Sequence, residues 1–309
     1  MRKTPVSVAS LLVAVAVLAS VSLAMGATPP KKGARRKDAA LAHASAVNRL
    51  SPGSHTLTIM VGNRQRTFIV DVPKGKVRAS RALVLVYHGA TDTAANTVTE
   101  TNMLPVTTSH GDVIAFLQGY DDTWNEGSGS TPARTAHVND VAFTAAVIAR
   151  LQKLTPYDPA RVAAVGISNG AIMVEDLGCH LASKIELIIP VEGQLSTVQS
   201  ASCAPAKPES VYEIHGTTDP DIPYSGGYFS SSIGYDTVLS APDSAARWAK
   251  LDGCASSSTS APNSTISLTS YAKCKGGAFV TLETVVDGQH VYPDNIGQLV
   301  IQELALLPK

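Results

Sequence analysis

Gly166-Ile167-Ser168-Asn169-Gly170 is the stretch of this 309-residue chain that decides its fold. The residues before it, 161–165, predict a short buried strand, and the residues after it, 171–177, predict the start of a helix. A serine between them lies on a sharp turn that presents its hydroxyl at the edge of a sheet. Flanking glycines suit such a turn because its neighbours pack against bare backbone. Glycine and serine are common, so the pentapeptide is informative only in this context.

The rest of the chain alternates predicted strands and helices. Continuous apolar runs are typical of strands buried on both faces, and apolar residues at helical spacing indicate helices that cover a sheet. The alternation predicts an α/β fold with a mostly parallel central sheet and helices on both faces. The expected strands are 56–61 and 64–72, joined as a hairpin by Gly62-Asn63, then 82–87, 113–117, 161–165, 185–189, 211–214, 265–271 and 279–286; the expected helices are 138–154, 171–177, 244–251 and a last one capped by Asp294.

In a sheet of this kind the chemistry gathers where strands end. Ser168, Asp219 and His290 each follow a predicted strand, and their order along the chain is that of the α/β-hydrolases. A serine hydroxyl is a poor nucleophile until an imidazole takes its proton, and the imidazole needs a carboxylate to hold its tautomer. We therefore predict Ser168 as the nucleophile, His290 as the base and Asp219 as the acid.

Both partners of the serine have competitors. Asp221 lies two residues after Asp219, and we favour Asp219 because prolines fix the turn around it. Among the eight histidines, His290 is the one late enough to follow the acid. His88 and His215 each precede a glycine at a strand end, which suits the shaping of a loop better than proton transfer.

A developing oxyanion needs two N–H donors. We expect one from Asn169, the residue after the nucleophile, and the other from Ala90 or Thr91 in the loop after the His88-Gly89 strand end. Asparagine also tolerates unusual backbone angles, which is an alternative reason for Asn169. The two readings are compatible because the expected role uses the backbone.

Several segments match one family. The most specific are Ser168-Asn169-Gly170-Ala171 and the run from His215 to Pro220, His-Gly-Thr-Thr-Asp-Pro. From about Gly53 to Pro293 the chain resembles the secreted esterases of the polyhydroxybutyrate depolymerase and feruloyl esterase group, within the α/β-hydrolases. Further matching segments are 83–89, 119–125, 139–143, 161–162, 189–193, 221–227, Trp248, Gly253-Cys254 and 288–293.

The resemblance implies the same triad and an ester substrate. It also implies that Trp124 lies near the substrate cleft, with ordinary core packing as the alternative. Tyr292 stands where the family often has tryptophan before the final proline, so a smaller aromatic would lie in the substrate pocket beside the catalytic histidine. Asn139-Asp140 stands where the family often has two acidic residues, so a local contact is expected to differ.

The N-terminus has the features of a signal peptide over residues 1–26. Two basic residues, Arg2 and Lys3, precede an apolar run from Val6 to Leu23, and small residues follow at the expected cleavage point. An uncleaved membrane anchor is the alternative, because the run is about long enough to span a bilayer. Its richness in alanine, serine and valine favours cleavage.

Cleavage would release a secreted protein, either extracellular or periplasmic. Residues 27–50 carry a cluster of lysines and arginines and predict a disordered basic leader. Residues 51–309 predict one α/β-hydrolase catalytic domain, which is long enough for a full hydrophobic core.

The four cysteines suggest two disulfides, as expected for a secreted protein. Three pairings are possible, and sequence order favours Cys179–Cys203 and Cys254–Cys274. A zinc site is the alternative, but the long spacings and the absence of any Cys-x-x-Cys argue against it. Asn263-Ser264-Thr265 is a glycosylation sequon that matters only in a eukaryotic secretory route.

We therefore predict a secreted serine carboxylic-ester hydrolase that works through an acyl-enzyme, on feruloyl or acetyl esters of plant polysaccharide or on 3-hydroxybutyrate esters of polyhydroxyalkanoate. It needs no metal and no organic cofactor. The net charge of zero argues against a nucleic-acid partner, and we expect a monomer that does not bind membranes after signal cleavage. The alternatives are a serine peptidase of the same fold and a non-catalytic binding protein on a hydrolase scaffold.

Overall fold

The computed structural model of the chain describes residues 49–231 and 234–308. The predicted signal peptide and all of the predicted leader except Arg49 and Leu50 lie outside the described residues. All of the described residues belong to one compact unit.

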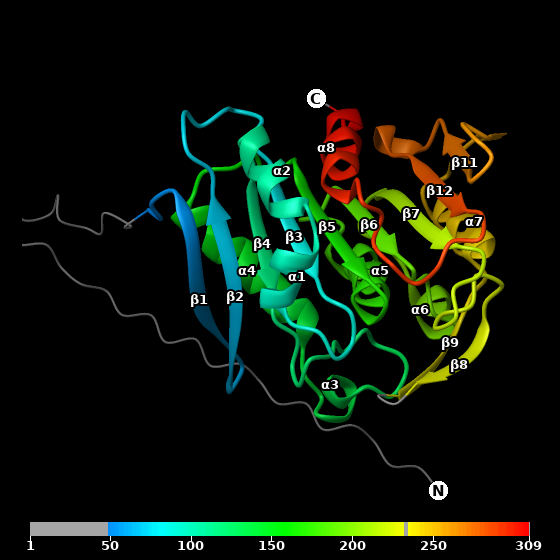
Figure 1. Cartoon of the computed structure of the whole chain (residues 1–309), viewed down its shortest axis with the longest axis horizontal. Helices are drawn as coiled ribbons and strands as arrows, with labels where there is room; N and C mark the ends of the chain where they lie inside the picture. Colours follow the sequence, from blue (N-terminus) through cyan, green and yellow to red (C-terminus); the bar gives the residue numbers. More distant parts are fainter. Residues whose placement is uncertain (1–48, 232–233, 309) are drawn as a thin grey trace, which may run out of the picture. The chain divides into compact units, whose positions relative to one another are not determined.

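Ten strands of this unit form one sheet, and two more form a separate hairpin (Figure 1). The strands are β1 (Gly53–Val61), β2 (Arg64–Val72), β3 (Leu83–Tyr87), β4 (Val113–Leu117), β5 (Val162–Ile167), β6 (Leu187–Val191), β7 (Ser210–Gly216), β8 (Gly227–Ser231), β9 (Gly234–Val238), β10 (Ser256–Ser260), β11 (Ile266–Ala272) and β12 (Val280–Val285).

The order across the sheet is β1-β2-β4-β3-β5-β6-β7-β12-β11-β10. The central strands from β4 to β12 run parallel to one another. The strands at both edges run antiparallel, with β1 and β2 at one edge and β11 and β10 at the other. The mostly parallel sheet that the sequence predicts is therefore confirmed. Because parallel strands all end at the same edge, the loops after β3, β5, β7 and β12 meet there.

Helices cover both faces of the sheet (Figure 1). The helices are α1 (Ala94–Glu100), α2 (Met103–His110), α3 (Pro132–Thr135), α4 (Asp140–Leu154), α5 (Asn169–Leu181), α6 (Thr197–Ser202), α7 (Ala241–Leu251) and α8 (Ile296–Leu306), with one 3₁₀ turn at Lys275–Gly277. Along β3, Leu83, Leu85 and Tyr87 belong to the core shared with α4, α5 and α7, whereas Val84 and Val86 belong to the core shared with α1, α2 and α8.

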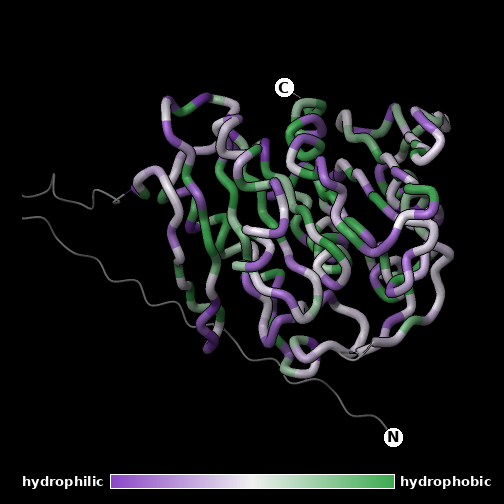
Figure 2. Tube along the Cα trace, viewed as in Figure 1, coloured by the Kyte–Doolittle hydropathy of each residue, from purple (hydrophilic) through white to green (hydrophobic). Residues whose placement is uncertain are grey.

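A strand buried on both faces has no polar side, and this explains the continuous apolar runs of the sequence. Figure 2 shows the hydrophobic segments gathered in the central strands. Burying an aliphatic side chain of this size stabilises the fold by about 1.5–3 kcal/mol, so the two cores together supply most of the driving force.

The structure adds elements that the sequence analysis did not predict. Four helices, α1, α2, α3 and α6, are too short to show a clear hydrophobic periodicity. The strand β10 is exposed along its whole length, so its sequence has no alternation of apolar and polar residues. The prediction that Asp294 caps the last helix is wrong by one residue. Asn295 is the N-cap, because the chain turns first through a bond from the Ile296 N–H to the Pro293 carbonyl.

The four cysteines form the two pairs that sequence order favours. Cys179 at the end of α5 is bonded to Cys203 after α6, and Cys254 before β10 is bonded to Cys274 after β11. Each bridge therefore fixes a peripheral segment to the neighbouring element. None of the helices in the described ranges is both long and apolar enough to cross a membrane.

Several acidic side chains lie deep in the fold. Glu175, Glu209 and Glu213 are fully buried, and so is Asp252, whose Oδ1 accepts the Glu209 N–H. The Glu175 Oε2 accepts the Trp248 indole N–H at 2.6 Å. Burial raises the pKa of Glu175 to about 8 and that of Asp252 to about 7, and it holds the pKa of Glu209 and Glu213 well above the ordinary value.

These raised pKa values predict that the fold is more stable in mild acid than in mild base. Above pH 4.5 the unfolded chain releases these protons first, so stability falls as pH rises until it passes the folded-state pKa of about 8 for Glu175. We expect Tm to be lower at pH 8.5 than at pH 5.5 by roughly 4 °C or more, measured by calorimetry.

The substitution Glu175→Gln should shrink this difference, because glutamine cannot ionise and still accepts the bond from Trp248. The matched control Glu100→Gln, on the surface of α1, should leave the difference unchanged. Equal Tm values at the two pH values would contradict the assignment of neutral buried acids.

Candidate active site

Ser168 lies between β5 and α5 with a left-handed backbone, φ 61° and ψ −127°. A non-glycine residue held at such angles costs about 1–3 kcal/mol and persists only when its surroundings enforce it. The Ser168 N–H donates to the Val191 carbonyl at the end of β6, at 3.0 Å. The strand-to-helix turn predicted from the sequence is therefore present, and it carries the backbone strain expected of it.

The glycines on either side of Ser168 permit this turn. A Cβ on Gly166 would lie 2.3 Å from the Gly170 carbonyl oxygen, and a Cβ on Gly170 would lie 2.4 Å from the carbonyl oxygens of Tyr87 and His88. Both distances are far below van der Waals contact with rigid backbone. Only glycine fits at either position, so the start of α5 packs directly on the end of β3.

His290 and Asp219 form the second part of the site. The His290 Nδ1 lies 2.7 Å from the Asp219 Oδ2, and the Asp219 carboxylate is fully buried. The other carboxylate oxygen, Oδ1, accepts the N–H groups of Asp221 and Ile222 at 2.7 and 3.0 Å. The His290 Nε2 is left as the nitrogen that can take a proton from a hydroxyl.

Asp221, the competitor for the role of the acid, occupies a different place. Its side chain is 66% exposed, and its Oδ2 lies 4.0 Å from the His290 Nε2 rather than from Nδ1. A carboxylate on that side cannot hold the imidazole with Nε2 free. The geometry therefore favours Asp219 as the orienting acid.

A cavity of about 250 Å³ connects these groups. Ser168 and His290 both line it, as do Asn169 and Ala90 at the predicted oxyanion site. The hairpin of β8 and β9 forms another part of the wall, with Phe229, Tyr235 and Asp236. The sequence analysis did not predict this hairpin, although the pair of short segments around Gly234 with alternating aromatic residues is a usable signal.

The N–H groups that the sequence predicts as oxyanion donors differ in whether they already have an acceptor within the protein. The Thr91 N–H donates to the Asp122 carbonyl at 2.9 Å, so it is not available to a substrate. Within residues 49–231 and 234–308, no backbone acceptor is found for the N–H of Ala90 or of Asn169, which opens α5. Of the two expected positions in the loop after β3, the structure favours Ala90.

Asn169 has a further role that the sequence did not reveal. Its Oδ1 accepts the backbone N–H of Trp124 at 2.7 Å. The side chain thus ties the loop after β4 to the start of α5.

Trp124 is a core residue. Its side chain is fully buried, its indole N–H donates to the His88 carbonyl at 2.8 Å, and its ring packs edge-on against Tyr87 at 5.1 Å. Trp124 is not among the described residues that line the cavity. Trp124 thus lies next to the cavity through its bond to Asn169, but its side chain packs in the core, which was the alternative to substrate binding. Through its bond to the His88 carbonyl, Trp124 supports the loop that carries Ala90.

Tyr292 also lies outside the cavity wall formed by the described residues. It packs against the core shared with α1, α2 and α8, and its hydroxyl donates to the Tyr87 carbonyl at 3.4 Å. The expectation that it shapes the substrate pocket is thus corrected. Tyr292 fixes the segment after His290 to the end of β3.

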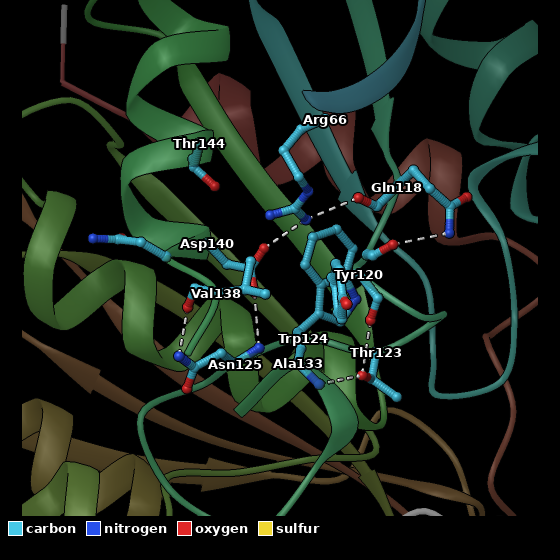
Figure 3. Close-up of polar contacts among 12 residues, drawn as sticks. Arg66, Gln118, Tyr120, Thr123, Trp124, Asn125, Ala133, Val138, Asp140 and Thr144 are labelled. Atoms are coloured by element: carbon cyan, nitrogen blue, oxygen red, sulfur yellow. Dashed lines mark hydrogen bonds and ion pairs between the residues drawn. The ribbon is translucent and has the colours of Figure 1, made fainter. Parts of the chain in front are cut away.

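A polar network supports the loop that carries Trp124 (Figure 3). Arg66 of β2 and Asp140 at the start of α4 form a buried ion pair at 2.6 Å, and Arg66 also donates to the Gln118 carbonyl at 3.0 Å. The Asp140 Oδ2 accepts the Asn125 N–H at 2.8 Å. Asn139, beside it, caps α4 through the Ala142 N–H. Where the family often has two acidic residues, Asp140 therefore forms the ion pair and Asn139 caps the helix.

Three groups at the site are close enough to hold a metal ion. One donor atom each from Glu192, Asp219 and His290 lies within 4.8 Å of the others. Two members of this group already bond to each other, through the Asp219 Oδ2 and the His290 Nδ1 at 2.7 Å.

Two proteins of known name are similar in sequence. The chain is 29% identical to "Feruloyl esterase B" of Piromyces equi over 238 residues, which is 74% of this chain and 43% of that protein. It is 28% identical to "Putative esterase NocK" of Nocardia uniformis subsp. tsuyamanensis, over 69% of this chain and 64% of that protein. The chain thus spans about half the length of these relatives. No family model matches the chain.

The fold has close counterparts among solved structures. An acetyl xylan esterase from Aspergillus awamori covers 82% of this chain at a TM-score of 0.61, with 13% sequence identity and 99% of its own chain aligned. At this identity the likeness establishes the fold alone. Together with the strand order and the turn at Ser168, it shows that the chain has the α/β-hydrolase fold.

The buried ion pair beneath the Trp124 loop predicts a large cost when one partner is removed. Arg66→Met should lower the free energy of unfolding by about 3–5 kcal/mol, because it leaves the Asp140 carboxylate buried without its cation. Urea unfolding measures this change. The double variant R66M/D140L should recover part of the loss, and Arg64→Met, on a half-exposed neighbour, should cost much less. Equal losses for R66M and R64M would contradict the account.

Proposed function

We propose that this protein is a serine carboxylic-ester hydrolase with Ser168 as nucleophile, His290 as base and Asp219 as acid. One observation carries the proposal. Ser168 is held in a strained turn and shares a cavity with His290, whose Nδ1 bonds to the buried carboxylate of Asp219. The named relatives, both esterases by name, support the same class of reaction.

The reaction follows from the roles of these groups. The His290 Nε2 takes the proton of Ser168 as its Oγ attacks the ester carbonyl, and the oxyanion that forms accepts bonds from the Ala90 and Asn169 N–H groups. The tetrahedral intermediate collapses when the imidazolium protonates the leaving alcohol. Water, deprotonated by His290, then attacks the acyl-enzyme and releases the carboxylic acid.

Asp219 keeps the imidazole in the tautomer that leaves Nε2 free. Burial alone would raise the pKa of Asp219, but the imidazole of His215, 3.4 Å from its Oδ2, and the hydrogen bond and charge of His290 outweigh burial and hold that pKa below the usual range. The acid is therefore ionised at every pH at which the base can work, and it stabilises the imidazolium.

The substrate is proposed to be an ester of a phenolic or short acyl group on plant polysaccharide, such as a feruloyl or acetyl ester. The name of the Piromyces equi relative supports the feruloyl choice. Esters of 3-hydroxybutyrate, the other class that the sequence indicates, are the comparison substrate. The two disulfides support an oxidising compartment, so we propose that the protein is secreted.

Hydrolysis of p-nitrophenyl acetate and butyrate tests the proposal. Residues 27–309 should turn over both esters, and Ser168→Ala should lower kcat by about 10⁴-fold or more, because no other group can form the acyl-enzyme. Methyl ferulate and hydroxybutyrate oligomers then rank the acyl groups. An amide substrate cleaved faster than any ester would instead identify a peptidase.

The two candidate acids are separated by paired substitutions. Asp219→Asn should lower kcat/KM by about 10⁴-fold, because the amide favours the wrong imidazole tautomer. Asp221→Asn should stay within about threefold of wild type, because an exposed charge contributes little. The reverse order of the two losses would reassign the acid.

A further inference from the structure

Glu192 is a buried acid beside the triad that the sequence analysis did not single out. It follows β6 with a left-handed backbone, φ 51°, and only 2% of the residue is exposed. A non-glycine residue in this conformation signals a constraint from its surroundings. Among the described residues, no lysine or arginine forms an ion pair with Glu192, and its one charge contact of that kind is with the His215 Nε2 at 3.5 Å.

The carboxyl group of Glu192 is fixed from the side of β7. The Gly216 N–H donates to both of its oxygens, at 3.1 and 2.9 Å. Gly216 packs against Gly288 of the His290 loop, where a Cβ would lie 2.4 Å from the Gly288 backbone. The carboxyl group is thereby placed so that one of its oxygens lies within 4.8 Å of an Asp219 oxygen and of a His290 nitrogen.

The hydrogen bonds of Asp219 leave one acceptor position for Glu192. Its Oδ1 accepts two N–H groups, from Asp221 and Ile222, and its Oδ2 accepts the His290 Nδ1 proton. The His215 Nε2 lies 3.4 Å from Oδ2, but its proton goes to the Ile222 carbonyl at 2.9 Å. One acceptor position of Oδ2 therefore remains, and a Glu192 oxygen lies within 4.8 Å of an Asp219 oxygen. Two carboxylates in such a buried place cannot both be ionised.

We propose that Glu192 is a positioning residue that stays protonated and donates its proton in a hydrogen bond to Asp219. The proposal rests on the proposed function, because it acts through the Asp219–His290 pair. In this chain of bonds Asp219 carries the charge, Glu192 carries the proton, and the carboxylate is held in the rotamer that meets His290. A neutral Glu192 adds no second negative charge beside the imidazole.

The electrostatics of the site agree with this assignment. Burial in the first place, and then the hydrogen bond and charge of Asp219, raise the pKa of Glu192 to about 9, against the opposing effect of the Gly216 N–H. The titratable groups that face it are Asp219, His215 and His290, and Glu192 and Glu283 both line a second cavity of about 270 Å³.

The test is the dependence of kcat/KM for p-nitrophenyl acetate on pH, from 5 to 10, in two variants. Glu192→Gln keeps a donor for Asp219 and has no charge to change. It should retain kcat/KM within about threefold of wild type. The loss of activity at low pH should occur at the same pH in both proteins, since neither protonated Glu192 nor glutamine carries a charge beside His290. The wild type should lose activity as pH rises through about 9, and Glu192→Gln should not. Glu192→Leu, which removes the donor, should lose about 10- to 100-fold.

Glu175→Gln serves as the control, because Glu175 is another buried acid with a raised pKa, and its carboxyl group bonds to Trp248 rather than to the triad. This variant should keep the alkaline loss. An acid limb that moves down by about one pH unit in Glu192→Gln would show that Glu192 is ionised, and would overturn the proposal. Wild-type activity in Glu192→Leu would overturn it as well.

Infrared difference spectra of wild type minus Glu192→Gln give a readout that needs no turnover. A protonated-carboxyl band should be present at pH 7 and fade between pH 8 and 10. Its absence at pH 7 would overturn the proposal even if Glu192→Leu failed to fold. A protein that shows the band but hydrolyses no ester would refute the proposed function and leave the protonation of Glu192 intact.

Discussion

The contact of backbone on backbone at Gly170 and the end of β3 is the constraint on which the rest of the site depends. Because α5 starts with no side chain between it and the carbonyls of Tyr87 and His88, the chain must turn within one residue, and that residue is Ser168. The strain of its left-handed backbone is offset by the packing of two cores on either side of β5. The turn places the serine hydroxyl and the first N–H groups of α5 at the edge of the sheet where the parallel strands end.

The loops around this turn are held by buried hydrogen bonds and one buried ion pair. Asn169 binds the backbone of Trp124, Trp124 binds the His88 carbonyl, and the Arg66–Asp140 pair supports the loop from β2. On the other side, Tyr292 fixes the chain after His290 to β3. A catalytic geometry must be held to within a fraction of an ångström, and rigid buried supports of this kind achieve that.

The sequence predicted the fold and named the residues of the proposed triad because both leave local signals. Buried parallel strands such as β3 and β5 are continuous apolar runs. Ser168 directly follows β5, and Asp219 and His290 lie in the loops after β7 and β12. The errors arose where the deciding contact is distant in sequence. An aromatic residue such as Trp124, beside a Gly-Tyr-Asp-Asp loop, could line a cleft or pack in the core. The fold decides between the two, because Trp124 is buried against Tyr87 of β3. The sequence could not decide between Ala90 and Thr91 as the oxyanion donor, because the bond from the Thr91 N–H to the Asp122 carbonyl appears only in the fold. The role of Glu192 was not predicted, because its partners come from β7 and the His290 loop.

Labelling with a fluorophosphonate tests the central claim, that Ser168 is a nucleophile activated by His290, most directly. Intact mass after incubation should show one adduct per chain, peptide mapping should place it on Ser168, and His290→Ala should react far more slowly. An unmodified chain, or an adduct on another residue while ester turnover continues, would contradict the account.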